Sequence, residues 1–415
     1  MTKNSCRTVR IIFLTLLLLP PGARAGAQDQ NQPVVITLEK ALSLALEQNR
    51  DVLMADQERY KADAQVSEAR SGAFPQLSVT GQYARNIKKP VLFLPPNSPI
   101  NPSNKTAAFE IGSNNSYQGG AQLSQVLFSR KLGAALEVAK TYHEFSEEAY
   151  RSTQEDVSLQ VKKAFYGVLL TQKLVEANRQ GLAVVRANFE NVQAQYRHGT
   201  AAEFDLLRAE VQLANTEPLV ISAENTLVLA ANGLKNLLAI PLETGIRIEG
   251  SFTFTEMDSA ALAEGRRSAM VSNPVLTQLQ LQESMLEENI SIQRADLWPT
   301  LALFGSYQWQ TQDNTFQFRN YNWANMLTVG LSVSFPVFDG FRTSARVEQA
   351  SVDRQKVHLA RLKAEEGVKI LIQAAELKMA EARKRIAGQE QNIKQAEKAV
   401  QIAQTRYKNG VGTQL

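Results

Sequence analysis

The segment LTVGLSVSF, residues 327–335, decides the fold. Its Leu, Val and Phe side chains alternate with Thr, Gly and Ser, which is the two-residue period of a β-strand with one apolar face. The segments that follow Pro75 and Pro299 alternate in the same way, and a fourth segment does so less cleanly. We therefore predict four strands, at about residues 76–86, 116–128, 301–311 and 323–335.

These strands have the length and the flanking residues of membrane strands. Each has about ten residues or more, enough to cross a bilayer. Trp298, Trp309 and Trp323 flank or lie in the second strand pair, and aromatic side chains at strand ends are typical of a membrane–water interface. A small soluble sheet with an aromatic core is the alternative.

Four strands are too few for a barrel, which needs about eight. Open sheet edges are not tolerated in lipid, because their backbone groups would lack partners. We therefore predict that several chains share one barrel. The strand count alone does not choose between a dimer and a trimer.

The chain is an internal duplication. At an offset of 224 residues Asn49 meets Asn273, Arg70 meets Arg294 and Pro75 meets Pro299, whereas at 210 Phe128 meets Phe338. The first copy therefore carries 14 extra residues, in a segment with five prolines between positions 90 and 102. We expect that segment to be an irregular, exposed loop.

Long helices follow each strand pair. Apolar residues recur every seven positions from Val161 to Tyr196 and again from Ile372 to Tyr407, as in helices that wind around each other. Residues 132–197 alone would extend about 99 Å as one helix. We predict a helical hairpin over 132–240 and a long helix over 342–408; an ordinary helical bundle is the alternative.

The first 25 residues have the order of a secretory signal peptide. Three bases precede an apolar run, and Ala23-Arg24-Ala25 follows a break. Without the four bases of this segment the chain has 41 Lys and Arg against 41 Asp and Glu, which argues against a nucleic-acid partner. The only cysteine, Cys6, lies before the apolar run, so no disulfide and no lipid-anchored cysteine are expected.

Catalytic and metal-binding patterns are not found in the sequence. The three histidines, His143, His198 and His358, stand on predicted helices without a second ligand at metal spacing. No phosphate-binding glycine loop, nucleophile elbow or HExxH motif occurs. We therefore expect no enzyme activity, no cofactor and no metal.

The order of the motifs resembles the TolC family of outer-membrane efflux proteins along the whole mature chain. The motifs are Leu38-x-x-Ala41-Leu42-x-Leu44-Ala45-Leu46-x-x-Asn49, the paired Arg70-x-x-x-x-Pro75 and Arg294-x-x-x-x-Pro299, and the two turns that follow the long helices. The resemblance implies a mainly helical fold with membrane β-structure, as a homotrimer. Each chain would give four strands to a shared twelve-stranded barrel and its helices to a coiled-coil tunnel through the periplasm.

The resemblance also implies partners and site residues. The partners would be a periplasmic adaptor, an inner-membrane transporter and the lipid bilayer of the outer membrane. The tips that dock the adaptor and close the tunnel would be the two turns after the long helices. The docking residues would be Gly199, Thr200, Gly410, Val411, Gly412 and Thr413, and the tunnel-closing candidates Tyr196, Asp205 and Tyr407.

The domain organisation follows from the duplication. We expect a signal peptide at 1–25, a first repeat at 26–257 and a second at 258–415. The function implied is an outer-membrane channel of a tripartite efflux or type I secretion system, passing small molecules or polypeptides outward. The alternative is a periplasmic coiled-coil adaptor or scaffold without a pore. An ordinary porin is disfavoured, because it would have many strands and few helices.

The second repeat stops where the first continues. Leu415 matches Phe204 at an offset of 211, and the first copy continues to about Ile240. We expect that about 35 residues of a descending helix are missing and that the chain is an incomplete form of a longer protein. The apolar stripe from Ile372 to Tyr407 is then expected to lie bare.

Overall fold

The computed structural model describes residues 34–253, 258–408 and 411. The predicted signal peptide and Gly410, Gly412 and Thr413 lie outside the described residues. The chain divides into two compact units. The first unit includes residues 168–236 and 240–250, the second residues 39–167, 237–239 and 251–415, and each is described separately.

A four-stranded antiparallel sheet forms one part of the second unit. Its strands are β2 (Gln76–Arg85), β5 (Asn115–Phe128), β7 (Thr300–Asp313) and β8 (Ala324–Ser334), in that spatial order. The two repeats meet where β5 pairs with β7, with Gly120 opposite Gln308. The four strands predicted from alternation are therefore present, and β2 and β8 form the edges of this sheet.

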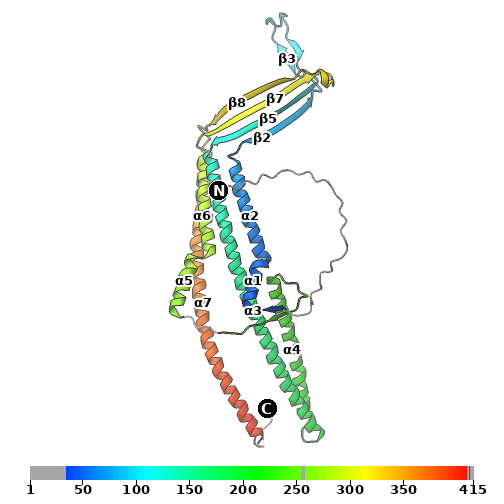
Figure 1. The fold of residues 1–415 in the computed structure, drawn as a ribbon, viewed down its shortest axis with the longest axis vertical. Helices are drawn as coiled ribbons and strands as arrows, with labels where there is room; N and C mark the ends of the chain where they lie inside the picture. The colour runs from blue at the N-terminus through cyan, green and yellow to red at the C-terminus, as the bar shows by residue number, and fades with distance from the viewer. Residues whose placement is uncertain (1–33, 254–257, 409–410, 412–415) are drawn as a thin grey trace, which may run out of the picture. The chain divides into compact units, whose positions relative to one another are not determined.

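The second unit also contains helices, some of which meet one end of the sheet (Figure 1). They are α1 (Leu38–Gln48), α2 (Arg50–Ser71), the first part of α3 (Arg130–Arg197), α5 (Ser259–Val271), α6 (Pro274–Ala295) and α7 (Arg342–Lys408). The helix α6 packs along α7, as does α5. Each repeat therefore has a helix, a strand pair and a long helix.

The segment between β2 and β5 contains an ordered hairpin. Strand β3 (Val91–Leu94) pairs with β4 (Ala107–Glu110). The side chain of Asn101 closes the loop between them, because its amide donates to the carbonyl oxygens of Leu94, Pro95 and Lys105 at 2.9–3.3 Å. The expectation of an irregular loop was wrong for these two strands, since Pro90 precedes β3 and the other four prolines lie in the connection, which leaves the backbone of each strand free to pair.

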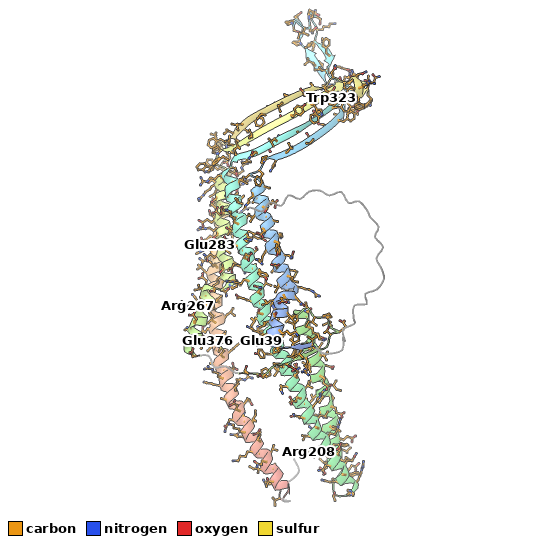
Figure 2. All side chains as sticks on the ribbon, in the orientation of Figure 1. Glu39, Arg208, Arg267, Glu283, Trp323 and Glu376 are labelled. Atoms are coloured by element: carbon orange, nitrogen blue, oxygen red, sulfur yellow. The ribbon has the colours of Figure 1, made fainter. Side chains whose placement is uncertain are left out.

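In the second unit, a contact between an acid and a basic residue joins two helices in each repeat, with the acid on a different helix of the two. Arg59 of α2 contacts Glu147 of α3 at 2.8 Å, and Glu283 of α6 contacts His358 of α7 at 3.1 Å. Arg59 corresponds to Glu283 at the offset of 224, and Glu147 corresponds to His358 at 211. The duplication has therefore kept the position of the contact and exchanged which helix carries the acid (Glu283 is labelled in Figure 2).

Glu283 predicts a dependence of stability on pH. Burial raises the pKa of its carboxyl, but hydrogen bonds from Arg361 and His358 and their positive charges outweigh burial, so the pKa lies below its ordinary value of 4.5. A lowered pKa contributes stability that is present above the ordinary pKa and is lost as the pH falls through the folded value. Glu283→Gln should remove about 1 kcal/mol at pH 7. Urea unfolding of both proteins at pH 7 and near pH 3.5 should show this difference shrinking at the lower pH; an unchanged difference would contradict it.

The first unit contains a helical hairpin and a small parallel sheet. Residues 168–197 of α3 turn back through α4 (Glu203–Leu237), and β1 (Val34–Ile36) pairs with β6 (Ile246–Ile248). Ion pairs link the two helices at 2.6 and 2.9 Å, from Arg179 to Glu224 and from Arg186 to Glu217. Val168, Val175, Val220 and Leu234 are buried in this unit, and the first two belong to the heptad predicted from Val161.

The C-terminal part of α7 exposes apolar side chains in the described structure. Ile386, Ile393 and Val400, which share the predicted heptad position, are 46–57% exposed. The missing descending helix, with which this expectation was linked, stays a prediction.

Asn49 and Asn273 match in the duplication because each caps a helix. The Asn49 side chain accepts from Asp51 N at 2.8 Å and Val52 N at 3.4 Å, and Asn273 accepts from Val275 N and Leu276 N. Asn49 is also buried, 4% exposed, and its amide donates to the carbonyl of Leu237 at 2.9 Å.

Asn49→Ala should therefore destabilise the protein more than Asn273→Ala. Both changes remove a cap worth about 1 kcal/mol, but only the first leaves the Leu237 carbonyl without its side-chain donor, for a total of about 2–3 kcal/mol. Guanidinium unfolding of the two variants measures the difference. Equal losses would show that the bond to Leu237 contributes nothing.

Candidate functional site

One face of the four-stranded sheet is apolar. Residues paired across neighbouring strands point to the same side. Val79 of β2 is therefore level with Tyr307 of β7 and Leu327 of β8. Most of these side chains are exposed, with Val79 at 72% and Val329 at 69%. The apolar face comprises Leu77, Val79, Tyr83, Ala121, Leu123, Leu301, Leu303, Tyr307, Trp309, Leu327, Val329, Leu331 and Val333.

The opposite face is mainly polar, with Phe304 and Met326 as apolar exceptions, and it is uncharged. Gln82, Gln118 and Gln310 stand in one row, with the Gln118 amide donating to the Gln82 carbonyl, and Gln308 lies in the next row. Within β2, β5, β7 and β8 this face holds no Asp, Glu, Lys or Arg. An alternating two-faced sheet of this kind separates an apolar phase from water. The two-residue period revealed the strands, but sequence reasoning gave these glutamines no role.

Aromatic side chains collect at both ends of the sheet. At the end away from the helices, Tyr117 contacts the rings of Tyr83, Phe318 and Tyr321 at 4.9–5.5 Å, and Trp323 lies at this end as well (Figure 2). At the helical end lie Trp298, Phe338 and Phe341. Such collars are characteristic of strands that cross from one interface to the other.

The strand lengths fit a bilayer. The strands of the sheet have 10–14 residues. Ten residues rise about 33 Å, and a tilt of about 40° reduces this to about 25 Å, the height of the apolar band of outer-membrane barrels. Among the helices that the structure describes, none is long and apolar enough to cross a membrane.

The first predicted tip is a tight helix-to-helix turn in the first unit. Helix α3 ends at Arg197, and Gly199 has φ +73°. The Gly199 N–H donates to the Tyr196 carbonyl at 2.9 Å and the Thr200 N–H to the Gln195 carbonyl at 2.9 Å. This is a Schellman ending, which requires a left-handed residue that glycine adopts without strain.

The tunnel-closing candidates of the first repeat lie close to that turn. Tyr196 is 40% exposed, and Asp205 stands with Glu203 in the first turn of α4, where acids complement the helix dipole. The structure thus brings Tyr196, Gly199, Thr200 and Asp205 to one tip within ten residues of chain.

The second predicted tip repeats the hydrogen bond of the first. Val411 N–H donates to the Arg406 carbonyl at 3.1 Å, and at the offset of 211 these residues match Thr200 and Gln195. Val411 is 66% exposed. Tyr407 belongs to α7, and the remaining candidates of this tip lie outside the described residues.

No metal centre is found in the part of the chain that the structure describes. His143 and His358 stand on helices as predicted, and each contacts an acid of another helix: His143 lies 3.1 Å from Asp63, and His358 the same distance from Glu283. Their partners are distant in the sequence, so spacing along the chain could not reveal them.

Known proteins are similar to this chain in sequence and in fold. The family model for outer membrane efflux proteins matches residues 41–239 and 266–415. The alkaline protease secretion protein AprF of Pseudomonas aeruginosa is 26% identical over 247 residues, 59% of this chain and 50% of AprF. The outer membrane protein TolC of Vibrio cholerae is 24% identical over 322 residues, 75% of this chain and 67% of TolC.

A solved structure shows the shared fold. The structure of CusC matches with a TM-score of 0.70 at 18% identity, covering 91% of this chain and 83% of the CusC chain. The chain spans about half the length of AprF and about two thirds of the length of TolC.

Proposed function

The chain belongs to the family of outer membrane efflux proteins, and from this premise we propose that it is the outer-membrane channel of a tripartite efflux or type I secretion system. Solute passes through it from the periplasm-spanning assembly to the exterior without covalent change. Membership of this family assigns the chain to passive transport and not to catalysis.

The two-faced sheet carries this proposal. Its apolar face lies against lipid and its polar face lines water, with the aromatic collars at the two interfaces. The edges β2 and β8 pair with the same edges of neighbouring copies, because lipid leaves no other partner for their backbone groups. Three copies with four strands each make a closed barrel.

The relatives support both variants of the function. AprF is named for the secretion of alkaline protease, and the CusC structure is one of a transmembrane channel. The uncharged polar face suits either cargo, since it imposes no charge barrier on a polypeptide or a small molecule.

The helical turns fit the docking role. Both tips end a long helix with the same hydrogen bond between residues five apart. In the proposed assembly the trimer meets a periplasmic adaptor at these tips, through Gly199, Thr200, Gly410, Val411, Gly412 and Thr413. Tyr196, Asp205 and Tyr407 close the tunnel, and an inner-membrane transporter supplies the energy.

A periplasmic adaptor without a pore is the competing function. An adaptor works in water, where an apolar face with side chains such as Val79 and Leu327 exposed by about 70% would aggregate. The sheet therefore favours the channel.

Conductance in planar lipid bilayers tests the proposal. The protein expressed from its complete gene and purified in detergent should insert and give discrete conductance steps. Its ion selectivity in a salt gradient should be weak, because the polar face is uncharged. A protein that stays in solution without detergent and adds no conductance would favour the adaptor.

A further inference from the structure

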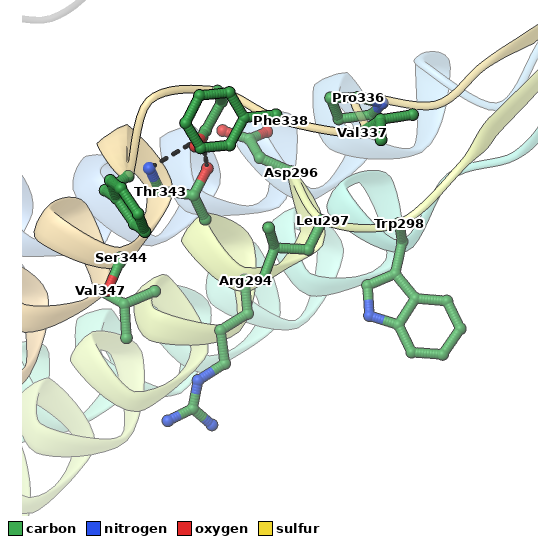
Figure 3. Close-up of a pocket in the computed structure, with 12 residues that line it drawn as sticks. Arg294, Asp296, Leu297, Trp298, Pro336, Val337, Phe338, Thr343, Ser344 and Val347 are labelled. Atoms are coloured by element: carbon green, nitrogen blue, oxygen red, sulfur yellow. Dashed lines mark hydrogen bonds between the residues drawn. The ribbon is translucent and has the colours of Figure 1, made fainter.

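A pocket lies where the second repeat passes from helix to sheet. Its volume is about 490 Å³, and its walls come from the end of α6 with the loop after it, the loop that follows β8, and the start of α7 (Figure 3). Asp339 orders this wall, because its carboxylate accepts hydrogen bonds from the hydroxyl and the N–H of Thr343. These hydrogen bonds hold the pKa of Asp339 below its ordinary value.

The first repeat has the equivalent pocket. Its volume is about 450 Å³, and it lies between the end of α2, the end of β5 and the start of α3. Arg70 and Phe128 of this pocket match Arg294 and Phe338 of the other in the duplication. We call the two the junction pockets. Their repetition argues that they are a feature of the fold and not an accident of one loop.

The junction pockets expose large apolar side chains. In the second repeat Trp298 is 46% exposed, Phe338 75% and Phe341 76%. Phe341 also has φ +64°, a conformation that costs a bulky residue about 1–3 kcal/mol. The strained backbone of Phe341 and the exposure of its ring both cost free energy. We therefore expect these aromatic rings to be covered in the assembled protein.

Basic side chains outnumber the acids Asp296 and Asp339 around the second-repeat pocket. The Arg130 guanidinium lies 4.4 Å from the centre of the Trp298 ring. Lys131 and Arg346 approach Asp296 at 3.1 and 3.7 Å, and Arg70, Arg294 and Arg342 stand in the adjoining helical turns, all three exposed. Aromatic rings next to cations are the pairing that phospholipid interfaces select.

We propose that each junction pocket binds an anionic glycerophospholipid of the membrane leaflet that faces the helices. The proposal rests on the proposed function, which places the sheet in a bilayer. The arginines hold the phosphate, and the aromatic and aliphatic walls take the start of the acyl chains.

Tryptophan quenching tests the proposal directly. The variant W309F/W323F keeps Trp298 as the only tryptophan and reports on the pocket, whereas W298F/W323F keeps Trp309 and reports on the apolar face. Each is reconstituted with phosphatidylglycerol or phosphatidylcholine brominated near the carbonyl end of the acyl chains. Trp309 should be quenched equally by both lipids, and Trp298 at several-fold lower mole fractions of phosphatidylglycerol.

The two proposals fail in different ways. If neither lipid quenches Trp309, the sheet is not in the bilayer and the proposed function fails. If Trp309 is quenched and Trp298 shows no headgroup preference, or no quenching because another copy covers it, only the lipid site is overturned. Inorganic phosphate is added at the same concentration as the lipid. If Trp298 then loses its preference for phosphatidylglycerol, the lipid site is overturned in favour of a site for free phosphate.

Charge removal gives a second readout that needs no change of tryptophan. Native mass spectrometry should show phosphatidylglycerol retained over phosphatidylcholine, and R130Q/R294Q/R342Q should lose about fivefold of that preference per removed charge. The control R267Q removes an exposed arginine of α5 (labelled in Figure 2) and should leave the preference unchanged. Equal losses per removed charge in the two variants would reduce the effect to net charge and contradict a site.

Discussion

Replacing Val329 by arginine should abolish insertion into the outer membrane, whereas replacing its neighbour Thr328 should not. Val329 lies in the middle of β8 on the apolar face and is 69% exposed. Arginine at the midplane of a lipid-facing strand costs about 2–4 kcal/mol, and a trimer bears this cost at three positions. The barrel should therefore fail to assemble, and membrane fractions should lack the protein.

Thr328→Arg is the matched control, and it should also change the ion selectivity of the channel. Thr328 lies on the polar face, opposite Ser306 of β7, so its arginine would project into water. The protein should insert at normal abundance, and its channels should become selective for anions, because each trimer would carry three new positive charges in the lumen. The reversal potential in a salt gradient measures this. Equal abundance of both variants in the membrane would contradict the assignment of the two faces.

Gly199→Val should uncouple export while leaving insertion intact. Gly199 has φ +73°, and a Cβ there would meet no atom within 4 Å, so the damage is confined to the backbone. A left-handed conformation costs a residue with a Cβ about 1–2 kcal/mol, and β-branching adds to this. The Schellman ending should therefore open and displace the proposed docking tip.

The control for this prediction is Gly181→Val, inside the helix α3 that leads to the turn. Gly181 also has open space around its Cβ position, but no left-handed φ. We expect both variants to insert, with export of substrate and cross-linking to the adaptor lost only for Gly199→Val. Normal export by that variant at wild-type abundance would remove the docking role from the turn.

The strands could be predicted because the two-residue alternation of apolar and polar side chains continues over many residues. In residues 327–335 every second side chain is apolar, and only an extended backbone places these on one face. The heptad from Val161 predicted its helix for the same reason. Both signals are periodic and local, so one sequence suffices to read them.

The elements that sequence reasoning missed depend on distant partners. Strands β1 and β6 have three residues each and lie more than 200 residues apart, too short for a period to show. The ordering of the β3–β4 hairpin rests on the amide of Asn101, whose acceptors nothing in the sequence marks. The junction pockets likewise join the ends of α6, β8 and α7, which only the fold brings together.

The mass of the particle in detergent tests the central claim, that one chain supplies a third of a membrane barrel. The protein expressed from its complete gene is extracted in detergent, and the protein mass per particle is measured by light scattering with the detergent contribution subtracted. The two-faced sheet with its free edges β2 and β8 predicts three copies per particle. A stable, monodisperse monomer would show that the edge strands need no hydrogen-bond partners from other copies and would contradict the shared barrel.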